Sequence, residues 1–264
     1  MLIINQWLGR LGQNILQILR AIHFAKIQGH TNIQFPQHQL LNSTTISLNK
    51  TITDNEHIIK HNFFYLHQIH IKDTEPYIYK QYFQKYIKPI FKLNYKEGLN
   101  DNIYIHIRSE DLYNSNPHSK HIGSPLAYYN HIIDNYYKDK KIIIIANDTI
   151  DPCIDILCKR PNVSFFSSED LLTDLEQFTN IKHLIISIGL FDFLLYLLND
   201  KLETLFMPDF TYSELIQGSY GTNIDVNIIN IPNYIKLGEW TASSKQRQLM
   251  LDYILPNPVI ITKL

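Results

Sequence analysis

The sequence predicts an α/β protein with mainly parallel sheets, and two observations lead to this fold class. First, strand-like and helix-like segments alternate regularly from about residue 100 onward, as they do in βαβ units. Second, the run Ile142–Ile145 is continuously β-branched, which is typical of a parallel strand covered on both faces. Hydrophobic residues make up 45% of the 264 residues and charged residues 19%, so the composition is that of a folded chain rather than a disordered one.

Before residue 100, the sequence predicts a strand, a glycine turn and a long buried helix. The strand is expected at Leu2–Ile4 and the turn at GRLGQN, residues 9–14. In the helix, apolar residues recur with the α-helical period at Ile15, Ile18, Leu19, Ile22 and Ala25. The other expected elements are a strand at 32–35, an irregular stretch with short strands at 37–73, and a helix at 75–91 that kinks or ends at Pro89.

After residue 100, the first expected strand is half-buried and ends near Arg108, because Ile103, Ile105 and Ile107 alternate with polar or aromatic residues. The later strands are expected at 141–148, 162–166, 183–187, 202–208 and 225–231, and the helices at 124–137, from 151, at 167–178 and at 191–199. The expected N-terminal caps of three helices are Ser124 with Pro125, Asp151 with Pro152, and Ser167 with Asp170.

The polar stretch NYKEGLND, residues 94–101, is the expected linker between two lobes. We therefore expect an N-terminal lobe at 1–98, a second lobe at 99–240, and a C-terminal helix and tail at 241–264.

The charge balance argues against nucleic acid or an anionic membrane as a general partner, since 24 Lys and Arg against 25 Asp and Glu leave a formal net charge of −1. No signal peptide or membrane span is expected, because the most apolar run is interrupted by Gly189 and Asp192. We expect a soluble, cytoplasmic protein in which Cys153 and Cys158 are reduced thiols packed as small hydrophobes, rather than a disulfide or metal site.

Polar residues follow the carboxyl ends of several predicted strands, where ligands collect in open parallel sheets. They are Arg108-Ser109-Glu110-Asp111, Asn147-Asp148, Ser167-Ser168, and Ser187 with Gly189. A guanidinium could pair with a phosphate, and a carboxylate with the amines of a base. Each residue taken singly could also be ordinary loop chemistry, so the prediction of a nucleotide site depends on their convergence.

Other residues offer alternatives to this site. Gly9 and Gly12 permit a tight turn and a close approach of backbone to a ligand. His106, His118 and His121 could be zinc ligands, although a chain with 12 histidines brings some together by chance. Asp174 and Glu176 are expected on the solvated face of their helix.

Taken together, these residues resemble the fucosyltransferase superfamily, which holds the alpha-1,2- and alpha-1,6-fucosyltransferases and the protein O-fucosyltransferases. Members carry a GRLGNQ-like turn near the amino end, and GRLGQN keeps Gly9, Arg10, Gly12 and Asn14 of that turn. The other similarities occur in the family's order along nearly the whole chain.

The motif H-x-R-R-x-D-Y of the family is matched by His106, Arg108 and Asp111, with Ser109 in place of the second arginine. Asn147-Asp148 resembles the family's strand ending in Ser/Thr-Asp. SIGLFDFL, against SGGTFSFW in the family, keeps Ser187, Gly189, Phe191 and Phe193.

The resemblance implies a GT-B-like fold of two Rossmann-like lobes that transfers fucose from GDP-fucose to a glycan or protein hydroxyl, with inversion and without a metal or other cofactor. The second lobe would hold the nucleotide sugar. By the resemblance, Arg108 would stabilise the leaving diphosphate, Asp148 would read the guanine edge and His106 would lie beside the nucleotide. Asn14 and the turn with Gly9, Arg10 and Gly12 would face the reaction centre, and Asn147, Ser187 and Gly189 would complete the donor site.

The proton acceptor of such a reaction stays open between Asp111 and Glu110, either of which could instead orient Arg108. Ser109, Leu190 and Asp192 depart from the family pattern, and Asp192 could cap its helix or indicate another donor. The alternatives are therefore another GDP- or UDP-sugar donor, a catalytically idle nucleotide- or glycan-binding protein, and a metal-dependent hydrolase built on the histidines.

Overall fold

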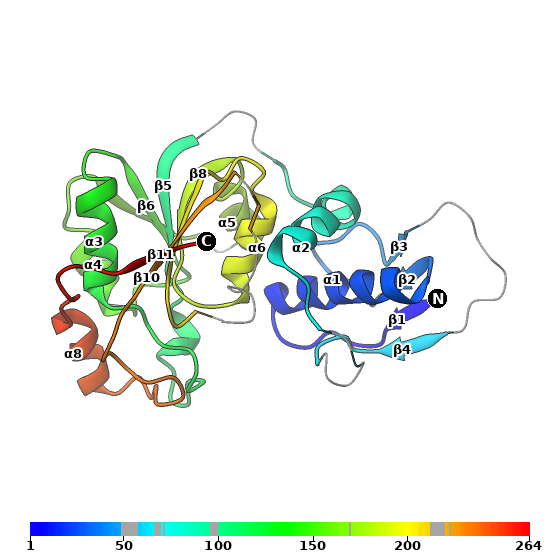
Figure 1. The fold of residues 1–264 in the computed structure, drawn as a ribbon, viewed down its shortest axis with the longest axis horizontal. Coiled ribbons are helices and arrows are strands. Elements are labelled where there is room, and N and C mark those ends of the chain that lie inside the picture. The colour runs from blue at the N-terminus through cyan, green and yellow to red at the C-terminus, as the bar shows by residue number, and fades with distance from the viewer. Residues whose placement is uncertain are drawn as a thin grey trace.

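The structure is a computed structural model that describes residues 1–48, 58–65, 70, 72–95, 100–168, 170–211, 220–221 and 223–264. It is an α/β protein, and the described residues form two mixed, mostly parallel sheets, one of four strands and one of seven. Figure 1 shows the four-stranded sheet with the blue and cyan helices at one end of the molecule and the seven-stranded sheet at the other. The predicted fold class of mainly parallel α/β is confirmed. The predicted linker at 94–101 includes residues 96–99, which lie outside the described residues.

The four-stranded sheet is formed by the first 61 residues and is covered by α1 (Leu11–Gln28). In sheet order its strands are β3 (Thr45–Ser47), β2 (Asn32–Gln34), β1 (Leu2–Ile4) and β4 (Ile59–His61). The strand β1 pairs in parallel with β2 and β4, whereas β3 runs antiparallel to β2. The helix α1 ends at Gly29, whose φ of 77° is the left-handed conformation that glycine adopts without strain. The predicted short strands at 37–73 are thus β3 and β4.

The predicted helix at 75–91 changes type before it ends at its proline. It begins as α2 (Pro76–Tyr82), continues as a π-helical turn (Phe83–Ile87) and closes as a 3₁₀ turn (Lys88–Ile90) around Pro89. Proline lacks an N–H and blocks the preceding turn, which explains the end of the helix. Side chains from this segment bond the last carbonyls of α6 (Leu190–Leu198) and the residue after it, as Gln84 Nε2 does to Leu197 O at 2.8 Å.

The seven-stranded sheet has the strand order β11-β10-β9-β8-β5-β6-β7. Its strands are β5 (Asn100–His106), β6 (Ile142–Ile145), β7 (Val163–Phe166), β8 (Ile181–Ile185), β9 (Thr204–Pro208), β10 (Asp225–Ile229) and β11 (Ile261–Lys263). All neighbours are parallel except β10 and β11. The chain runs outward from β5 in one direction through β6 and β7, and in the other through β8, β9 and β10. The order therefore reverses between β5 and β8, and open α/β sheets bind ligands at such a switch point.

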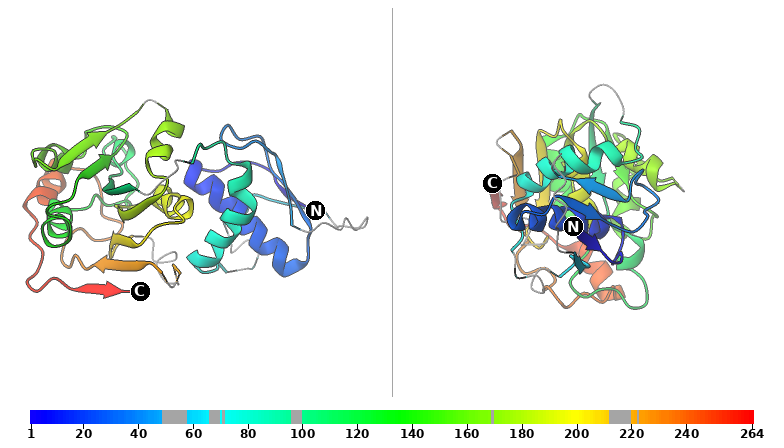
Figure 2. Two further views of the ribbon diagram at one scale, coloured as in Figure 1. Left: turned by 90° about the horizontal axis from the view of Figure 1, so that it is seen from above. Right: turned by 90° about the vertical axis from the view of Figure 1, so that its right-hand side faces the viewer.

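Helices cover both faces of this sheet (Figures 1 and 2). The helices α3 (Leu126–Tyr136), α4 (Pro152–Leu157) and α8 (Ser244–Asp252) lie on one face, and α5 (Leu171–Gln177) and α6 on the other. Alternation along β5 sends Ile103, Ile105 and Ile107 into the core under α3 and α4 and Tyr104 into the opposite core, so the strand is buried on both faces and not half-buried as predicted. Cys153 and Cys158, in and beside α4, are free thiols.

The helix α6 is packed between the seven-stranded sheet and the helices of the first part of the chain. One continuous hydrophobic cluster contains Ile18 and Ile22 of α1, Tyr79 of α2, and Phe193 and Leu197 of α6. Figure 2 shows α6, in yellow, beside the blue and cyan helices. Apolar packing thus holds α6 against α1 and α2.

Four expectations, three about helix caps and one about the tail, have definite outcomes. Asp151 caps α4 as predicted, since its side chain accepts from Cys153 N at 2.8 Å and Pro152 takes the first helical position. Pro125 rather than Ser124 is the cap residue of α3, and Asp170 rather than Ser167 caps α5. The tail at 241–264 contains α8, but it also adds β11 to the sheet edge, which the sequence did not predict.

Candidate functional site

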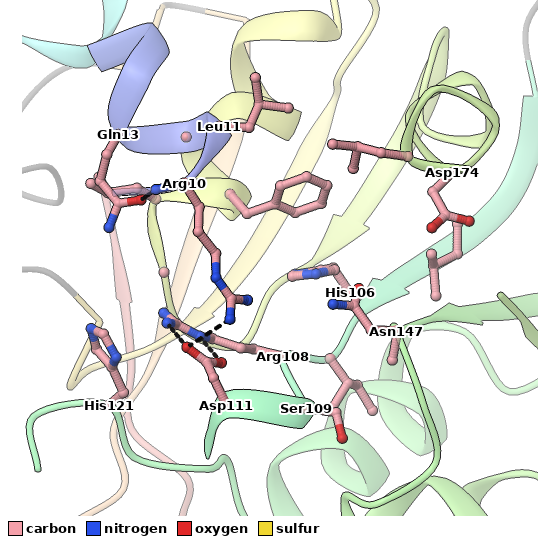
Figure 3. Close-up of a pocket in the computed structure, with 18 of the residues that line it drawn as sticks. Arg10, Leu11, Gln13, His106, Arg108, Ser109, Asp111, His121, Asn147 and Asp174 are labelled. Carbon is pink, nitrogen blue, oxygen red and sulfur yellow. Dashed lines mark hydrogen bonds and ion pairs between the residues drawn. The ribbon is translucent and has the colours of Figure 1, made fainter. Parts of the chain in front are cut away.

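A pocket of about 550 Å³ lies where the turn before α1 meets the carboxyl ends of β5 and β6. Six segments line it: Gly9–Gln13, His106–Asp111 without Glu110, His118 with His121, Ile145–Asn147, Leu171 with Asp174, and Gly189–Phe191. Eight of the predicted site residues are in this lining, namely Gly9, Arg10, Gly12, His106, Arg108, Asp111, Asn147 and Gly189. Figure 3 shows side chains from α1, α5 and the ends of β5 and β6 around the same space.

The amino ends of α1 and α6 meet at this pocket, and Gly12 is what allows their approach. A Cβ at Gly12 would lie 2.5 Å from the backbone carbon and oxygen of Leu190 and 2.8 Å from Phe191 N. Among the described residues, no hydrogen-bond partner is found for the first three amides of α6 or for the amides of Leu11 and Gly12 at the start of α1. Two helix amino ends with open amides carry partial positive charge and favour an anion between them.

Arg108 extends from the end of β5 and is held rigidly beside the amino end of α6. Its Nε donates to Asp111 Oδ1 at 3.0 Å and its Nη2 to Asp111 Oδ2 at 2.7 Å. Its Nη1 passes 2.8 Å from the position that a Cβ of Gly189 would occupy, and Gly189 has a φ of 136°. A side chain at position 189 would therefore clash with the guanidinium and strain the backbone.

Asp111 serves to orient Arg108, because both of its carboxylate oxygens accept from the guanidinium. Burial by itself raises the pKa of Asp111, but the hydrogen bonds and the charge of Arg108 outweigh it and leave the pKa below its ordinary value. Asp111 is thus an ionised partner of Arg108, which argues against a role as proton acceptor.

Arg10 brings a second guanidinium to the pocket from the other side (Figure 3). Its Nη1 lies 3.3 Å from Glu110 Oε2 and its Nη2 4.0 Å from Asp111 Oδ2, and 61% of its side chain is exposed. Glu110 Oε2 also accepts from Asn147 Nδ2 at 3.1 Å. An exposed ion pair of this kind contributes little stability, so Arg10 can exchange its partner for a ligand anion at low cost.

His106 forms a buried pair with Asp192, with Nδ1 of the imidazole bonded to Oδ1 of the carboxylate. The imidazole packs against the ring of Phe191 at a centroid distance of 4.9 Å and edge-on against Phe178 at 6.0 Å. Asp192 neither caps α6 nor lines the pocket, because the cap residue is Gly189 and no side chain bonds the first amides. The sequence did not predict this pair, since 86 residues separate its members.

Three predicted site residues do not line the pocket, and their side chains instead bond the neighbouring segments. Asn14 is 6% exposed and donates to Leu8 O at 3.0 Å, so it holds the glycine turn. The carboxylate of Asp148 accepts from Ser109 Oγ and from Ile150 N, which turns it toward its own loop and not into the pocket. Ser187 is buried and accepts from the backbone N–H of Arg108 at 2.9 Å.

Asp174 lines the pocket, which corrects the expectation of a solvated face. Its side chain is buried, and Oδ1 accepts from Ser168 N at 3.0 Å. This placement could have been predicted from the helical period, because position 174 lies on the same face of α5 as the apolar residues Leu171, Leu175 and Phe178. Asp174 is therefore a carboxylate available to a ligand at the pocket wall.

His118 and His121 also line the pocket, and their rings stack at a centroid distance of 4.4 Å. Burial, together with the charges of Arg108 and His118, lowers the pKa of His121 to about 4. Among the described residues, no group of three or more histidine, cysteine, aspartate or glutamate side chains has an arrangement that could hold a metal ion.

Comparisons with protein-family models, with curated proteins and with solved structures find no match for this chain. Within the described part of the chain, every helix is too short or too polar to cross a bilayer.

Proposed function

We propose that this protein is an inverting glycosyltransferase that moves a sugar from a nucleoside diphosphate sugar to a glycan hydroxyl. One observation carries the proposal: Arg108 is fixed by Asp111 at the place where the amino ends of α1 and α6 converge. The resemblance of the chain to the fucosyltransferase superfamily makes GDP-fucose the first donor to test.

The chemistry of this anion site suits a departing diphosphate. As the bond between the sugar and the diphosphate breaks, negative charge grows on the leaving oxygens. Arg108 and the open amides of two helices stabilise that charge without having to reorganise, which is how preorganised donors lower a barrier. Arg10 adds a second guanidinium once it leaves Glu110. No step of this mechanism requires a metal ion.

The fold supports a GT-B-like arrangement of two Rossmann-like lobes. The order β7-β6-β5-β8-β9-β10 corresponds to that of the dinucleotide-binding folds, and the pocket lies at its switch point. The turn at Gly9–Gln13 closes the pocket from the side of the four-stranded sheet. In this proposal the seven-stranded part holds the nucleotide and the first part approaches the acceptor.

Asp174 supports a guanine nucleotide over a uracil one, and in this role it replaces Asp148. Guanine presents two adjacent N–H donors on its Watson–Crick edge, which one carboxylate can accept together, whereas uracil presents a single N–H between two carbonyls. Of the two carboxylates in the described pocket lining, Asp111 is paired with Arg108 and Asp174 is not. Asn147 offers a further polar contact.

Binding is tested by thermal unfolding with GDP, UDP and EDTA. A nucleotide at about 100 times its Kd adds about 2.7 kcal/mol to the free energy of unfolding. We expect GDP to raise Tm, UDP to raise it less, and EDTA to leave it unchanged. Asp174→Asn should reduce the preference for GDP over UDP. Stabilisation by UDP alone would move the proposal to a UDP-sugar donor, and a loss of Tm in EDTA would favour the metal-dependent alternative.

Activity is tested by transfer from GDP-fucose to a panel of glycan acceptors. Arg108→Ala should lower kcat by about 10²- to 10³-fold, the cost of removing one preorganised donor to a developing anion. The matched control is Arg160→Ala, because Arg160 is paired with Asn130 and Asp134 away from the pocket. Normal turnover by Arg108→Ala would refute the assigned role. A wild type that binds GDP and transfers no sugar from any GDP- or UDP-sugar would support the idle binding protein instead.

A further inference from the structure

The buried pair of His106 and Asp192 is not part of the anion site, but its burial and geometry indicate a function of its own. The exposed fraction of His106 is 7% and that of Asp192 is 2%, so the pair is shielded from bulk water. The two residues come from different elements, the end of β5 and the first turn of α6. Holding a carboxylate at this depth opposes folding unless its partners compensate fully.

Helix capping does not account for Asp192. Its side chain accepts no hydrogen bond from the first amides of α6. Its Oδ2 is buried and has no hydrogen-bond partner among the described residues. The carboxylate therefore acts through one oxygen on one partner, the imidazole of His106.

This contact determines which nitrogen of His106 carries the proton. A carboxylate only accepts hydrogen bonds, so the shared hydrogen belongs to Nδ1 of the imidazole. In the neutral ring, Nε2 then has a free lone pair. The side chain lines the pocket and its Nδ1 edge is turned to Asp192, which does not (Figure 3 shows His106). Packing on Phe191 and Phe178 keeps the ring in this orientation.

We propose that His106 is the general base of the transfer and that Asp192 is its positioning residue, an inference that depends on the proposed function. The acceptor oxygen uses a lone pair to bond the anomeric carbon of the donor. The bond from that carbon to the diphosphate oxygen breaks, and its electron pair leaves with the diphosphate beside Arg108. The hydroxyl proton passes to Nε2 of His106, and Asp192 stabilises the resulting imidazolium.

The neighbouring carboxylates are less suited to this role. Both oxygens of Asp111 accept from Arg108. Glu110 is not part of the pocket lining, and its Oε2 accepts from Asn147 and pairs with Arg10. Within the described lining, His106 is the side chain that combines a free proton acceptor with a second group built to hold its charge.

The tautomer is tested first, by nitrogen NMR of the protein labelled with ¹⁵N-histidine at a pH where the ring is neutral. The wild type should show a protonated Nδ1 and an unprotonated Nε2 for the resonance that disappears in His106→Asn. Asp192→Asn should abolish this preference. A wild-type ring with its proton on Nε2 overturns the inference, whatever the variants do.

Kinetic measurements then distinguish a general base with its positioning residue from a pair of residues that only stabilises the fold. Asp192→Asn and His106→Asn should each lower kcat with GDP-fucose by about 10²- to 10⁴-fold, the range that a positioned base contributes. The KM for donor should stay within about twofold, and the double variant should be no slower than His106→Asn, because the two residues act as a unit. Asp155→Asn, an exposed change of the same kind on α4, is the matched control.

The outcomes separate a failure of the base and positioning roles from a failure of the proposed transferase function. An unchanged kcat in a folded Asp192→Asn variant, or a higher KM with an unchanged kcat, overturns the base and positioning roles and leaves the transferase intact. A wild type that transfers no sugar overturns the proposed function, and the nitrogen signals still report the tautomer independently.

Discussion

Gly12→Ala tests whether the contact between α1 and α6 makes the anion site. The new Cβ would lie 2.5 Å from the backbone carbon and oxygen of Leu190, whereas ordinary contacts lie at 3.4–4 Å. The three nearest atoms are all backbone, so the helix ends must separate by about 1 Å, and a displacement of this size can cost about 10²-fold in a positioned reaction. Overpacking costs about 1–3 kcal/mol, while alanine recovers up to about 1 kcal/mol of helix propensity. We therefore expect a small loss of stability and a large loss of function.

The affinity for GDP is measured by titration calorimetry, the transfer rate by kinetics with GDP-fucose, and the stability by thermal unfolding. We expect a loss in kcat/KM of about 10²-fold for Gly12→Ala, with a fall in Tm of only a few degrees. Gly123→Ala is the matched control, because its Cβ would meet side-chain atoms rather than backbone, the end of Met250 at 2.8 Å and the Tyr113 hydroxyl at 2.9 Å, outside the pocket. If Gly12→Ala binds GDP and turns over like the wild type, the convergence of the two helices does not form the anion site.

Three further predictions concern the site and the stability of the fold. Arg108→Lys keeps the charge but loses the paired hydrogen bonds to Asp111, so kcat should fall by about 10²-fold or more; wild-type rates would show that charge alone suffices. Because burial and neighbouring charges lower the pKa of His121 to about 4, neutral His121 stabilises the fold above its ordinary pKa of 6.5, and this contribution is lost as pH falls toward 4. The free energy of unfolding by urea should thus fall less steeply over this window in His121→Gln, and an identical slope would contradict the assignment. Asp170→Ala removes the cap of α5 and should cost about 1 kcal/mol, or about 2–4 °C in Tm; an unchanged Tm would show that the cap does not stabilise the helix.

The fold was predictable where local pattern and burial agree. The alternation at Ile103, Ile105 and Ile107 and the run Ile142–Ile145 correctly predicted β5 and β6, two paired interior strands of the larger sheet. The edge strand β11 was missed because three residues carry almost no periodic signal, and their pairing with β10 is decided by tertiary contact.

The residues around the pocket were predictable as a group, but not in their individual orientations. Positions at strand ends and turns could be read from the sequence, and eight of the proposed residues share one cavity. The direction of Asp148 depends on Ser109 and on the amide of Ile150. Asn14 likewise turns inward because the backbone of the glycine turn needs a donor at Leu8 O. Such choices are made by partners distant in space, which no local pattern encodes.

The shared packing of α6 has a consequence for how the molecule holds together. Since one hydrophobic cluster runs from α1 and α2 through α6 to the larger sheet, we expect melting at either end of this cluster to destabilise the other. Residues 1–95 expressed alone would lose the helix that covers α1 and α2, and residues 100–264 alone would present the bare flank of α6 to solvent. Each fragment is therefore expected to aggregate, and the intact chain to unfold in a single cooperative transition.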